Sequence, residues 1–323
     1  MNSQGEVVKD YLRKYQTVSS RKIAALIMRD IPGLFSSTEA CRNSIRYYRG
    51  ATGDRNRNRL SSESYIPKIA MPEAEDEDYE PFILPADCYP IAVISDIHVP
   101  FHDQDALEIA LERAIDIKAK TILINGDAID FYMLSNFQKD PRKRNIRDEI
   151  DMLKLVLAVI RKAIPRANIV YKFGNHEDRY DYYIMKNAPE LYHLEETHLD
   201  NVLGLSKNKI TIVQNKRVIR AGHLNIIHGH EYQFSISNPV NPARGLYLRA
   251  KKSALVGHFH QSSDHTETAI NGDVVTCWSV GCLCGLHPQY MPLNKWNWGF
   301  AEIHSDDGMF RVSNHRITNY RIV

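Results

Sequence analysis

Acids, amides and imidazoles follow the apolar segments of this sequence at five places. The apolar runs end in Asp96-Ile97-His98, in Gly126-Asp127-Ala128-Ile129-Asp130, in Gly174-Asn175-His176-Glu177, in His228, and in Gly257-His258-Phe259-His260. In open α/β sheets, ligands bind beyond the carboxyl ends of the strands. Each residue alone has an ordinary explanation, because an Asp after a strand often caps a turn and a lone histidine more often belongs to the core or the surface. Five strand ends that supply the same class of side chain predict a metal site.

The chemistry of these side chains narrows the ion that they would hold. Two carboxylates, Asp96 and Asp127, one amide oxygen, Asn175, and four imidazoles form a set that is too rich in nitrogen for Ca²⁺ or a typical Mg²⁺ site. The set lacks the thiolates of a structural zinc site and suits Mn²⁺, Fe or Zn²⁺. Seven ligands exceed what one ion takes but suit two ions that share a bridging carboxylate.

The order of the blocks resembles the calcineurin-like metallophosphoesterase superfamily, whose pattern is D-x-H, G-D-x-x-D, G-N-H-D/E, H and G-H-x-H. All five blocks are present in order over about residues 89–262. The resemblance implies that the first metal is held by Asp96, His98 and His260, that the second is held by Asn175, His228 and His258, and that Asp127 bridges the two. Mn²⁺ is the expected ion in both places, with Fe or Zn²⁺ as alternatives.

The resemblance also implies roles for His176 and Asp130. His176 is not a ligand in this family: it faces the scissile phosphate and is oriented by the last acid of G-D-x-x-D, here Asp130. Two divalent ions lower the pKa of a shared water, and the resulting hydroxide attacks phosphorus in line. His176, kept protonated by Asp130, stabilises the transition state or protonates the leaving oxygen. We expect Gly174 to permit the sharp exit of the chain from its strand, and Glu177 to hold the turn.

An alternating body over residues 86–323 must position these side chains. "YPIAVISD", "TILING" and "NIVYKF" are predicted strands, and residues 105–117 and 146–163 between them are predicted helices. Near-continuous apolar strands in this order are typical of a buried parallel sheet. Later strands are predicted to be antiparallel, because Asn271-Gly272 and Asp307-Gly308 are hairpin signals. The expected fold class is α/β, a layered αββα metallophosphoesterase sandwich with a small all-α N-terminal domain.

Residues 1–50 are predicted to form that helical domain, with a third helix that runs from Ser36 to Gly50. Arg42, Arg46 and Arg49 share one face of this helix beside an apolar stripe, as the recognition helix of a helix-turn-helix requires. Residues 1–60 carry 12 Lys and Arg against 5 Asp and Glu, so this part has a net charge of +7 and the rest has −5. We expect a nucleic-acid partner, DNA, for the head, and a solvated basic face is the alternative.

Two further segments are polar throughout. Residues 51–85 are predicted to be a flexible linker, because the basic run and the acidic run "MPEAEDEDYEP" lack an apolar period. An insert after the second strand, "NFQKDPRKRNIR", carries five basic residues: Lys139, Arg142, Lys143, Arg144 and Arg147. The insert either follows a phosphate backbone or forms a solvated loop.

The substrate is the least determined part of the prediction. Serine/threonine protein phosphatases of this superfamily have an arginine after the G-D-x-x-D acid, where this chain has Phe131-Tyr132. We expect a metal-dependent phosphodiesterase directed at DNA, a nuclease delivered by its head. The alternative is a phosphatase or cyclic-nucleotide phosphodiesterase that acts on a small substrate, with the head serving protein interaction or oligomerisation. A DNA-binding regulator with an inactive phosphoesterase body is disfavoured, because no ligand is missing. Similar layouts occur in bacteriophage-encoded proteins.

The composition favours the cytoplasm. No run approaches the roughly 18 apolar residues of a membrane span, and the amino terminus lacks the apolar stretch of a secretory signal. The five cysteines are an odd number scattered along the chain, which is typical of free thiols in a reducing compartment. We therefore expect neither disulfides nor a membrane partner.

Overall fold

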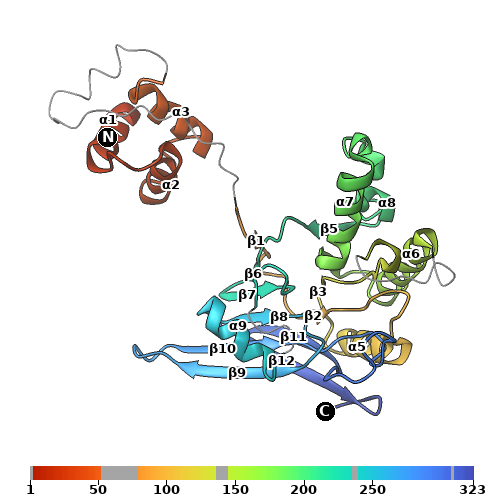
Figure 1. The fold of residues 1–323 in the computed structure, drawn as a ribbon. Coiled ribbons are helices and arrows are strands. Elements are labelled where there is room, and N and C mark those ends of the chain that lie inside the picture. The colour runs from red at the N-terminus through yellow and green to blue at the C-terminus, as the bar shows by residue number, and fades with distance from the viewer. Residues whose placement is uncertain (1–2, 52–78, 136–144, 235–238, 307–308) are drawn as a thin grey trace. The chain divides into compact units, whose positions relative to one another are not determined.

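The protein, seen in a computed structural model, divides into two units, Met1–Asp76 and Glu77–Val323, and the structure describes all residues except 1–2, 52–78, 136–144, 235–238 and 307–308. The first unit is a helical head of α1 (Gln4–Lys14), α2 (Ser20–Asp30) and α3 (Thr38–Tyr48) (Figure 1). The helices begin after Ser3, Ser19 and Ser37, whose side chains each accept a backbone N–H. The all-α head that the sequence predicts is therefore confirmed.

The head has a core of its own. Its buried members come from all three helices and include Val8, Leu12, Ile23, Ile27, Cys41 and Ile45. Two details differ from the sequence prediction: α3 begins after Ser37 rather than at Ser36, and Arg49 is its C-cap rather than part of its face. The apolar stripe of α3 packs inward, as predicted, through Cys41 and Ile45.

The second unit contains two stacked sheets. The larger has the order β13-β12-β11-β2-β3-β4-β5, and its strands are β2 (Ile91–Ile94), β3 (Thr121–Asn125), β4 (Asn168–Lys172), β5 (Ile210–Val213), β11 (Trp298–Asp306), β12 (Met309–Thr318) and β13 (Arg321–Ile322). The first four are parallel and the last three are antiparallel. The parallel-first, antiparallel-last order is thus confirmed.

The smaller sheet has the order β1-β6-β7-β8-β10-β9. Its strands are β1 (Phe82–Ile83), β6 (Ile219–Ala221), β7 (Leu224–Ile227), β8 (Ala254–Val256), β9 (Ser263–Thr268) and β10 (Val274–Ser279). Asn271-Gly272 joins β9 to β10 in an antiparallel pair, as predicted. β1 pairs with β6 although its residues fall in the range that the sequence assigns to the linker, because two residues are too few to show a strand period.

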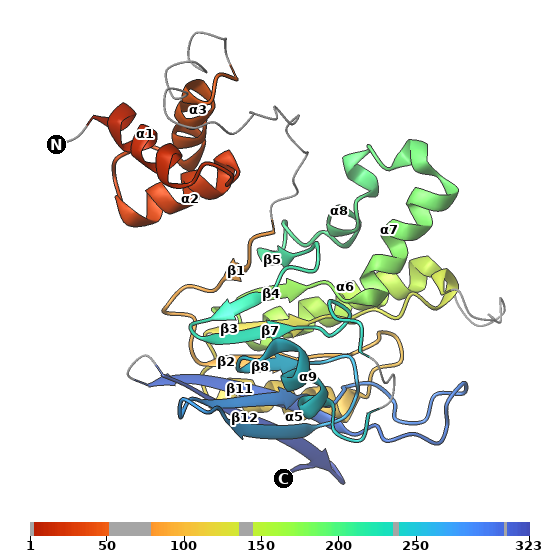
Figure 2. The same ribbon diagram turned by 60° about the vertical axis from the view of Figure 1, so that its left-hand side comes forward.

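Helices cover the outer faces of both sheets (Figure 2). α5 (Gln104–Asp116) and α6 (Ile146–Ala163) pack on the larger sheet, and α9 (Pro242–Ala250) packs on the smaller one. Val93, Leu123, Val170, Leu255 and Ala301 lie between the sheets. This arrangement is the predicted αββα sandwich.

The remaining helical elements lie between β3 and β5. They are η1 (Tyr132–Leu134), α7 (Asn175–Asn187), η2 (Pro189–Leu191), η3 (Glu195–Thr197) and α8 (Leu199–Leu203). α7 begins directly where β4 ends, so its first residues lie at the carboxyl edge of the larger sheet. Among the described residues, no helix is both long and apolar enough to cross a membrane.

Candidate metal centre

The structure brings all seven predicted ligands to one edge of the sandwich. Asp96 and His98 follow β2, Asp127 follows β3, Asn175 opens α7 after β4, His228 follows β7, and His258 and His260 follow β8. The two sheets therefore contribute to one centre from the carboxyl ends of five strands. Buried parallel strands end at the same edge, which explains how residues more than 160 positions apart meet.

One group of ligand atoms surrounds Asp96. His260 Nε2 lies 3.1 Å from Asp96 Oδ1, and His98 Nε2 lies 3.1 Å from His260 Nε2 and 3.9 Å from Asp96 Oδ1. The other carboxylate oxygen of Asp96 accepts hydrogen bonds from the Ser95 hydroxyl and the His258 backbone N–H. Asp96 thus uses one oxygen to hold its loop and directs the second toward the imidazoles.

A second group surrounds His228. Its Nε2 lies 3.2 Å from Asn175 Oδ1 and 3.2 Å from Asp127 Oδ2, and His258 belongs to the same cluster. Asp127 Oδ2 also lies 3.9 Å from His98 Nε2 of the first group. A carboxylate between two groups of ligands is placed as a bridging residue must be.

The geometry fits divalent ions. Two ligand atoms that each lie about 2.1 Å from one ion are roughly 3.0 to 3.5 Å apart, and the short separations in both groups have this size. Asp96 Oδ1 is buried, and the nearest polar atoms around it are the ring nitrogens of His260 and His98 rather than backbone donors, which places this oxygen as a metal ligand. The residues present therefore suit two ions: Asp96, His98 and His260 on one side, and Asn175, His228 and His258 on the other, with Asp127 between them.

The backbone at these ligands adopts an uncommon conformation. Asp96, His98, Asp127, His258 and His260 have φ of 55°, 50°, 52°, 65° and 56°. Left-handed backbone is sparse among non-glycine residues and persists where the surrounding structure imposes it. Backbone bonds impose it here, because Asp96 N donates to Gly126 O and His98 N donates to Asp127 O. The concentration of this conformation at five predicted ligands marks a built site.

Gly174 serves a different purpose from the one expected. Its φ is −101°, which any residue adopts, so the glycine is not needed for a turn. A Cβ at this position would overlap the carboxylate of Asp127. The glycine of G-N-H-E is thus required for close approach between the loops after β3 and β4. The expected reason was wrong, because a clash with a residue 47 positions away leaves no local signal.

Glu177 holds these two loops together. Its buried carboxylate accepts hydrogen bonds from the backbone N–H groups of Gly174, Asp127 and Ala128 and from the Tyr171 hydroxyl. Burial and the charge of Asp127 raise the pKa of Glu177, while the bonds from Tyr171 and Gly174 oppose this effect. Glu177 is therefore a structural acid, as the sequence predicts, and it stabilises the loop after β3 as well as its own turn.

The charges of the centre are mutually stabilised. Burial alone would raise the pKa of Asp127, but His228 and His176 reverse this and lower the pKa well below its ordinary value. Burial would lower the pKa of His228, yet the carboxylates of Asp127 and Asp96 raise it to about 10. His258 has a pKa lowered to about 4 by burial and by the neighbouring His228, and the carboxylates of Asp127 and Asp96 only partly oppose this shift. The buried acids thus remain carboxylates.

His176 and Asp130 lie beside the ligands. His176 Nδ1 donates to the backbone carbonyl of Asp130 at 2.8 Å and lies 3.3 Å from its carboxylate. That carboxylate lies nearer to His98, whose Nδ1 is 3.1 Å away. Asp130 therefore orients two imidazoles, His98 through its side chain and His176 mainly through its backbone, where the sequence predicts an interaction with His176 alone.

Arg179 is a charged residue of the site that the sequence analysis missed. Its guanidinium donates to the Asp130 carbonyl at 2.9 Å and to His176 Nε2 at 2.8 Å. The residue lies three positions after His176 on α7, so both side chains share one face of the helix. The spacing could have revealed it once the start of the helix was known. Phe131, which stands where the related phosphatases have arginine, is fully buried and stacks on Tyr180.

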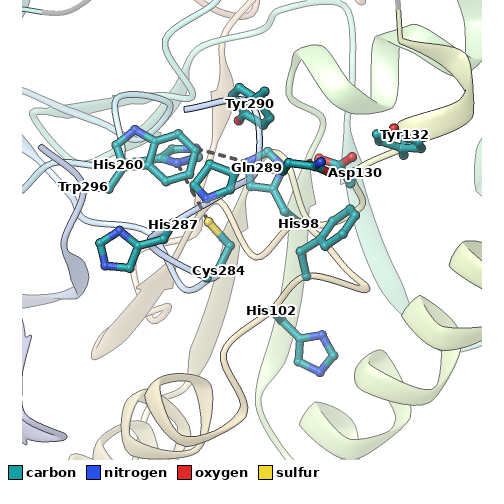
Figure 3. Close-up of a pocket in the computed structure, with 13 residues that line it drawn as sticks. His98, His102, Asp130, Tyr132, His260, Cys284, His287, Gln289, Tyr290 and Trp296 are labelled. Carbon is teal, nitrogen blue, oxygen red and sulfur yellow. Dashed lines mark hydrogen bonds and ion pairs between the residues drawn. The ribbon is translucent and has the colours of Figure 1, made fainter. Parts of the chain in front are cut away.

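A cavity of about 530 Å³ adjoins the first group of ligands. His98, Asp130 and His260 line one part of it, and residues 284–296 supply much of the rest (Figure 3). Cys284 faces the cavity, and its Sγ lies 3.8 Å from His260 Nδ1. All five cysteines are free and buried. The metal centre therefore borders a cavity that is large enough for a small organic group.

The predicted nucleic-acid contacts belong to the head and to the basic insert. Arg42 pairs with Glu39 at 3.3 Å, and the Arg49 guanidinium donates to the Val18 carbonyl and the Ser20 hydroxyl, so Arg49 serves the packing of the head itself. Arg46 is half-buried on α3. Lys139, Arg142, Lys143 and Arg144 lie outside the described residues. Binding of nucleic acid by either set stays a prediction.

Comparison with known proteins agrees with the motif. Residues 89–278 match the model of the calcineurin-like phosphoesterase family. Similar solved structures include Vps29 of Entamoeba histolytica complexed with Zn²⁺ (14% identity, 72% of this chain, 96% of that chain, TM-score 0.38). A dimetal phosphatase of Danio rerio (10%, 71%, 96%, 0.37) and Yfce, a phosphoesterase of E. coli (13%, 72%, 96%, 0.34), are also similar. No curated protein matches the chain.

The family match covers more than half of the chain and spans the loops that carry all seven ligands. The architecture, the ligand clusters and the order of the five blocks agree with it. This chain belongs to the calcineurin-like phosphoesterase family and is a dinuclear metal-dependent hydrolase of phosphoesters.

Proposed function

We propose that the protein hydrolyses phosphodiester bonds and that DNA is its substrate. The observation that carries the reaction class is the pair of ligand groups that share Asp127, set beside His176 and Arg179. Two divalent ions, when bound, lower the pKa of a water and neutralise phosphoryl oxygens. We propose Mn²⁺ as the ion, because the mixed carboxylate, amide and imidazole set suits it, with Fe or Zn²⁺ as alternatives.

The residues around the ions divide the remaining work. A phosphoryl oxygen at the centre competes with His176 Nε2 for the guanidinium of Arg179, since that nitrogen accepts from Arg179 in the structure. When Arg179 turns to the phosphate, Nε2 is available to hold a proton. Burial lowers the pKa of His176, but the carboxylates of Asp127 and Asp130 outweigh it and raise the pKa. His176 can then protonate the leaving oxygen, and Asp130 keeps its ring in place.

The arginine side chains near the centre favour a phosphodiester substrate over a phosphomonoester. The position after Asp130 is occupied by Phe131, whose ring is buried against Tyr180, so it offers no guanidinium to a terminal phosphate. Arg179 is the guanidinium that contacts the His176 side of the centre. A diester has one negative charge and needs fewer cations than a monoester dianion. This supports the phosphodiester proposal.

The head supports DNA as the source of that diester. Residues 1–60 have a net charge of +7, and an excess of Lys and Arg is the electrostatic basis of binding to a phosphate backbone. The second candidate is a small phosphoester such as a cyclic nucleotide, with the head serving protein interaction or oligomerisation. The size of the cavity, about 530 Å³, favours this candidate, since it is that of a small-molecule site.

An assay with three substrates tests the proposal. The protein is loaded with Mn²⁺ and given linear DNA, bis-p-nitrophenyl phosphate and p-nitrophenyl phosphate. We expect cleavage of DNA and of the bis ester well above that of the mono ester, and loss of all three activities after chelation. Faster cleavage of the mono ester would refute the diesterase, and cleavage of the bis ester without DNA would favour the small-substrate candidate.

A further inference from the structure

Four aromatic rings surround the cavity beside the metal centre. Phe101, Tyr132, Tyr290 and Trp296, here called the aromatic wall, line it together with the edge formed by His98, Asp130 and His260. Figure 3 shows Trp296 beside His260, Tyr132 beside Asp130, and Tyr290 between the two sides. Tyr290 and Trp296 belong to residues 284–297, which lie beyond the segment matched by the family model. The half of the wall formed by Tyr290 and Trp296 therefore lies outside the matched segment, and the half formed by Phe101 and Tyr132 lies within it.

Residues 284–297 are held in a defined shape. The Asn294 side chain donates to the carbonyls of Leu286 and Met291 at 2.7 and 2.9 Å and accepts from Trp296 N at 2.8 Å. The ends of the segment are tied to the site, because Gly285 N donates to Phe101 O and Asn297 N donates to His260 O. A segment bound in this way presents its rings at fixed places next to the ligands.

Two rings of the aromatic wall are exposed at the cavity, and the other two pack against neighbouring rings. Trp296 lies over His260 with 4.1 Å between ring centroids, and Tyr290 lies 6.3 Å from Trp296 at 67°. Tyr290 is 78% exposed and Phe101 is 41% exposed, so both present apolar surface to solvent at the cavity. Exposed aromatic rings beside a reaction centre are suited to stack on a planar group.

The lining also excludes other ligands. Among the residues that the structure describes, none that line this cavity is Lys or Arg, so the described lining offers no permanent cation to a second phosphate. A volume of about 530 Å³ accommodates one nucleoside-sized group rather than a folded strand. We propose that the aromatic wall binds a nucleobase carried by the phosphoester, with Tyr290 as the main stacking ring. This inference rests on the proposed phosphodiesterase function and specifies the organic part of its substrate.

Two esters with the same leaving group test the specificity. The Mn²⁺-loaded protein is given thymidine 5′-(p-nitrophenyl phosphate) and methyl p-nitrophenyl phosphate, and the ratio of their kcat/KM values is measured. Tyr290→Leu should lower this ratio about tenfold or more, the size of one lost stacking contact, whereas Tyr290→Phe should keep it. Leu293→Ala, in the same segment but 91% exposed and outside the lining, is the matched control. An equal loss for both esters in Tyr290→Leu would overturn the assignment.

A binding measurement tests the same inference without turnover. The Mn²⁺-loaded protein is titrated with adenosine 5′-monophosphate and with ribose 5-phosphate, which differ only in the base, and binding is followed by calorimetry. We expect the nucleotide to bind at least about tenfold tighter to the wild type and to lose this advantage in Tyr290→Leu. Equal affinities in the wild type would refute the inference. If the bis ester is not cleaved but the nucleotide still binds tighter, the proposed function fails and the nucleobase site stands.

Discussion

The metal centre and the helical head use their charged side chains in opposite ways. In the centre, Asp96 and Asp127 each commit one carboxylate oxygen to a backbone N–H and direct the other toward imidazoles. In the head, the Arg49 guanidinium donates hydrogen bonds to Val18 and to Ser20 at the start of α2, and Arg42 pairs with Glu39 on its own helix. The first arrangement groups ligand atoms from several loops around shared positions that a cation can occupy, whereas in the second the guanidinium groups are partly satisfied within the domain. A charged residue therefore indicates a bound ligand only where the protein's own groups do not use all of its hydrogen-bonding capacity.

Replacing Asp127 should give the largest effect, because it belongs to both ligand groups. We expect Asp127→Asn to lose both ions and to lower turnover at least about a thousandfold, since an amide cannot supply the charge of a bridging carboxylate. Elemental analysis of the purified variant measures the ions directly, with a change at the exposed last residue of α5, Asp116→Asn, as the control. A variant that keeps two ions would show that Asp127 does not bridge.

Replacing His176 should separate catalysis from metal binding. His176→Ala should retain both ions and lower kcat by about a hundredfold or more, as the loss of a general acid does. Because a better leaving group needs less protonation, the loss should shrink for p-nitrophenyl esters relative to alkyl esters. Metal content and kcat for both esters are measured side by side. Equal loss of metal would mean that His176 is itself a ligand.

Glu177→Gln should affect stability more than chemistry. The buried carboxylate accepts hydrogen bonds from four backbone N–H groups and one hydroxyl, and an amide cannot accept them all. We expect the free energy of unfolding to fall by about 3 kcal/mol. Urea unfolding of the metal-free protein measures it, with Tyr171→Phe as a control that removes a single bond. An unchanged midpoint would contradict the structural role.

Deleting residues 1–60 should weaken DNA binding without changing cleavage of bis-p-nitrophenyl phosphate. The deletion removes a net charge of +7, so the affinity for DNA should fall and its dependence on salt should flatten. Fluorescence anisotropy with labelled DNA at several salt concentrations measures both. Unchanged affinity would favour the candidate in which the head serves protein interaction or oligomerisation.

The smallest effects should distinguish the arginines of α3. Arg49→Ala should lower the stability of the head by about 1 kcal/mol, because its bonds to Val18 and Ser20 are lost. Arg42→Ala should leave stability nearly unchanged, since an exposed pair with Glu39 contributes little, and should reduce DNA affinity slightly. Thermal unfolding and anisotropy of both variants make the comparison. A larger loss of stability in Arg42→Ala than in Arg49→Ala would show that Arg42, and not Arg49, stabilises the head.

The sandwich and the ligand set could be predicted because their signals are local. Each ligand follows an apolar strand within a few residues, and the strands alternate with helices of clear period. Arg179 was missed because the direction of its side chain depends on where α7 begins. The start of this helix at Asn175 is not evident from the sequence, since the residues there are polar. β1 was missed because two residues carry no pattern, and the aromatic wall because its contacts join distant segments. What the sequence could not reveal is set by long-range packing.

The hydrogen bonds of Glu177 have a consequence for how the protein behaves when metal ions are scarce. They join the loops after β3 and β4 with groups of the polypeptide alone, so we expect the metal ligands to stay in place when a chelator removes the ions. We expect such an enzyme to lose activity when metal ions are scarce and to regain it when they are added back, without unfolding in between.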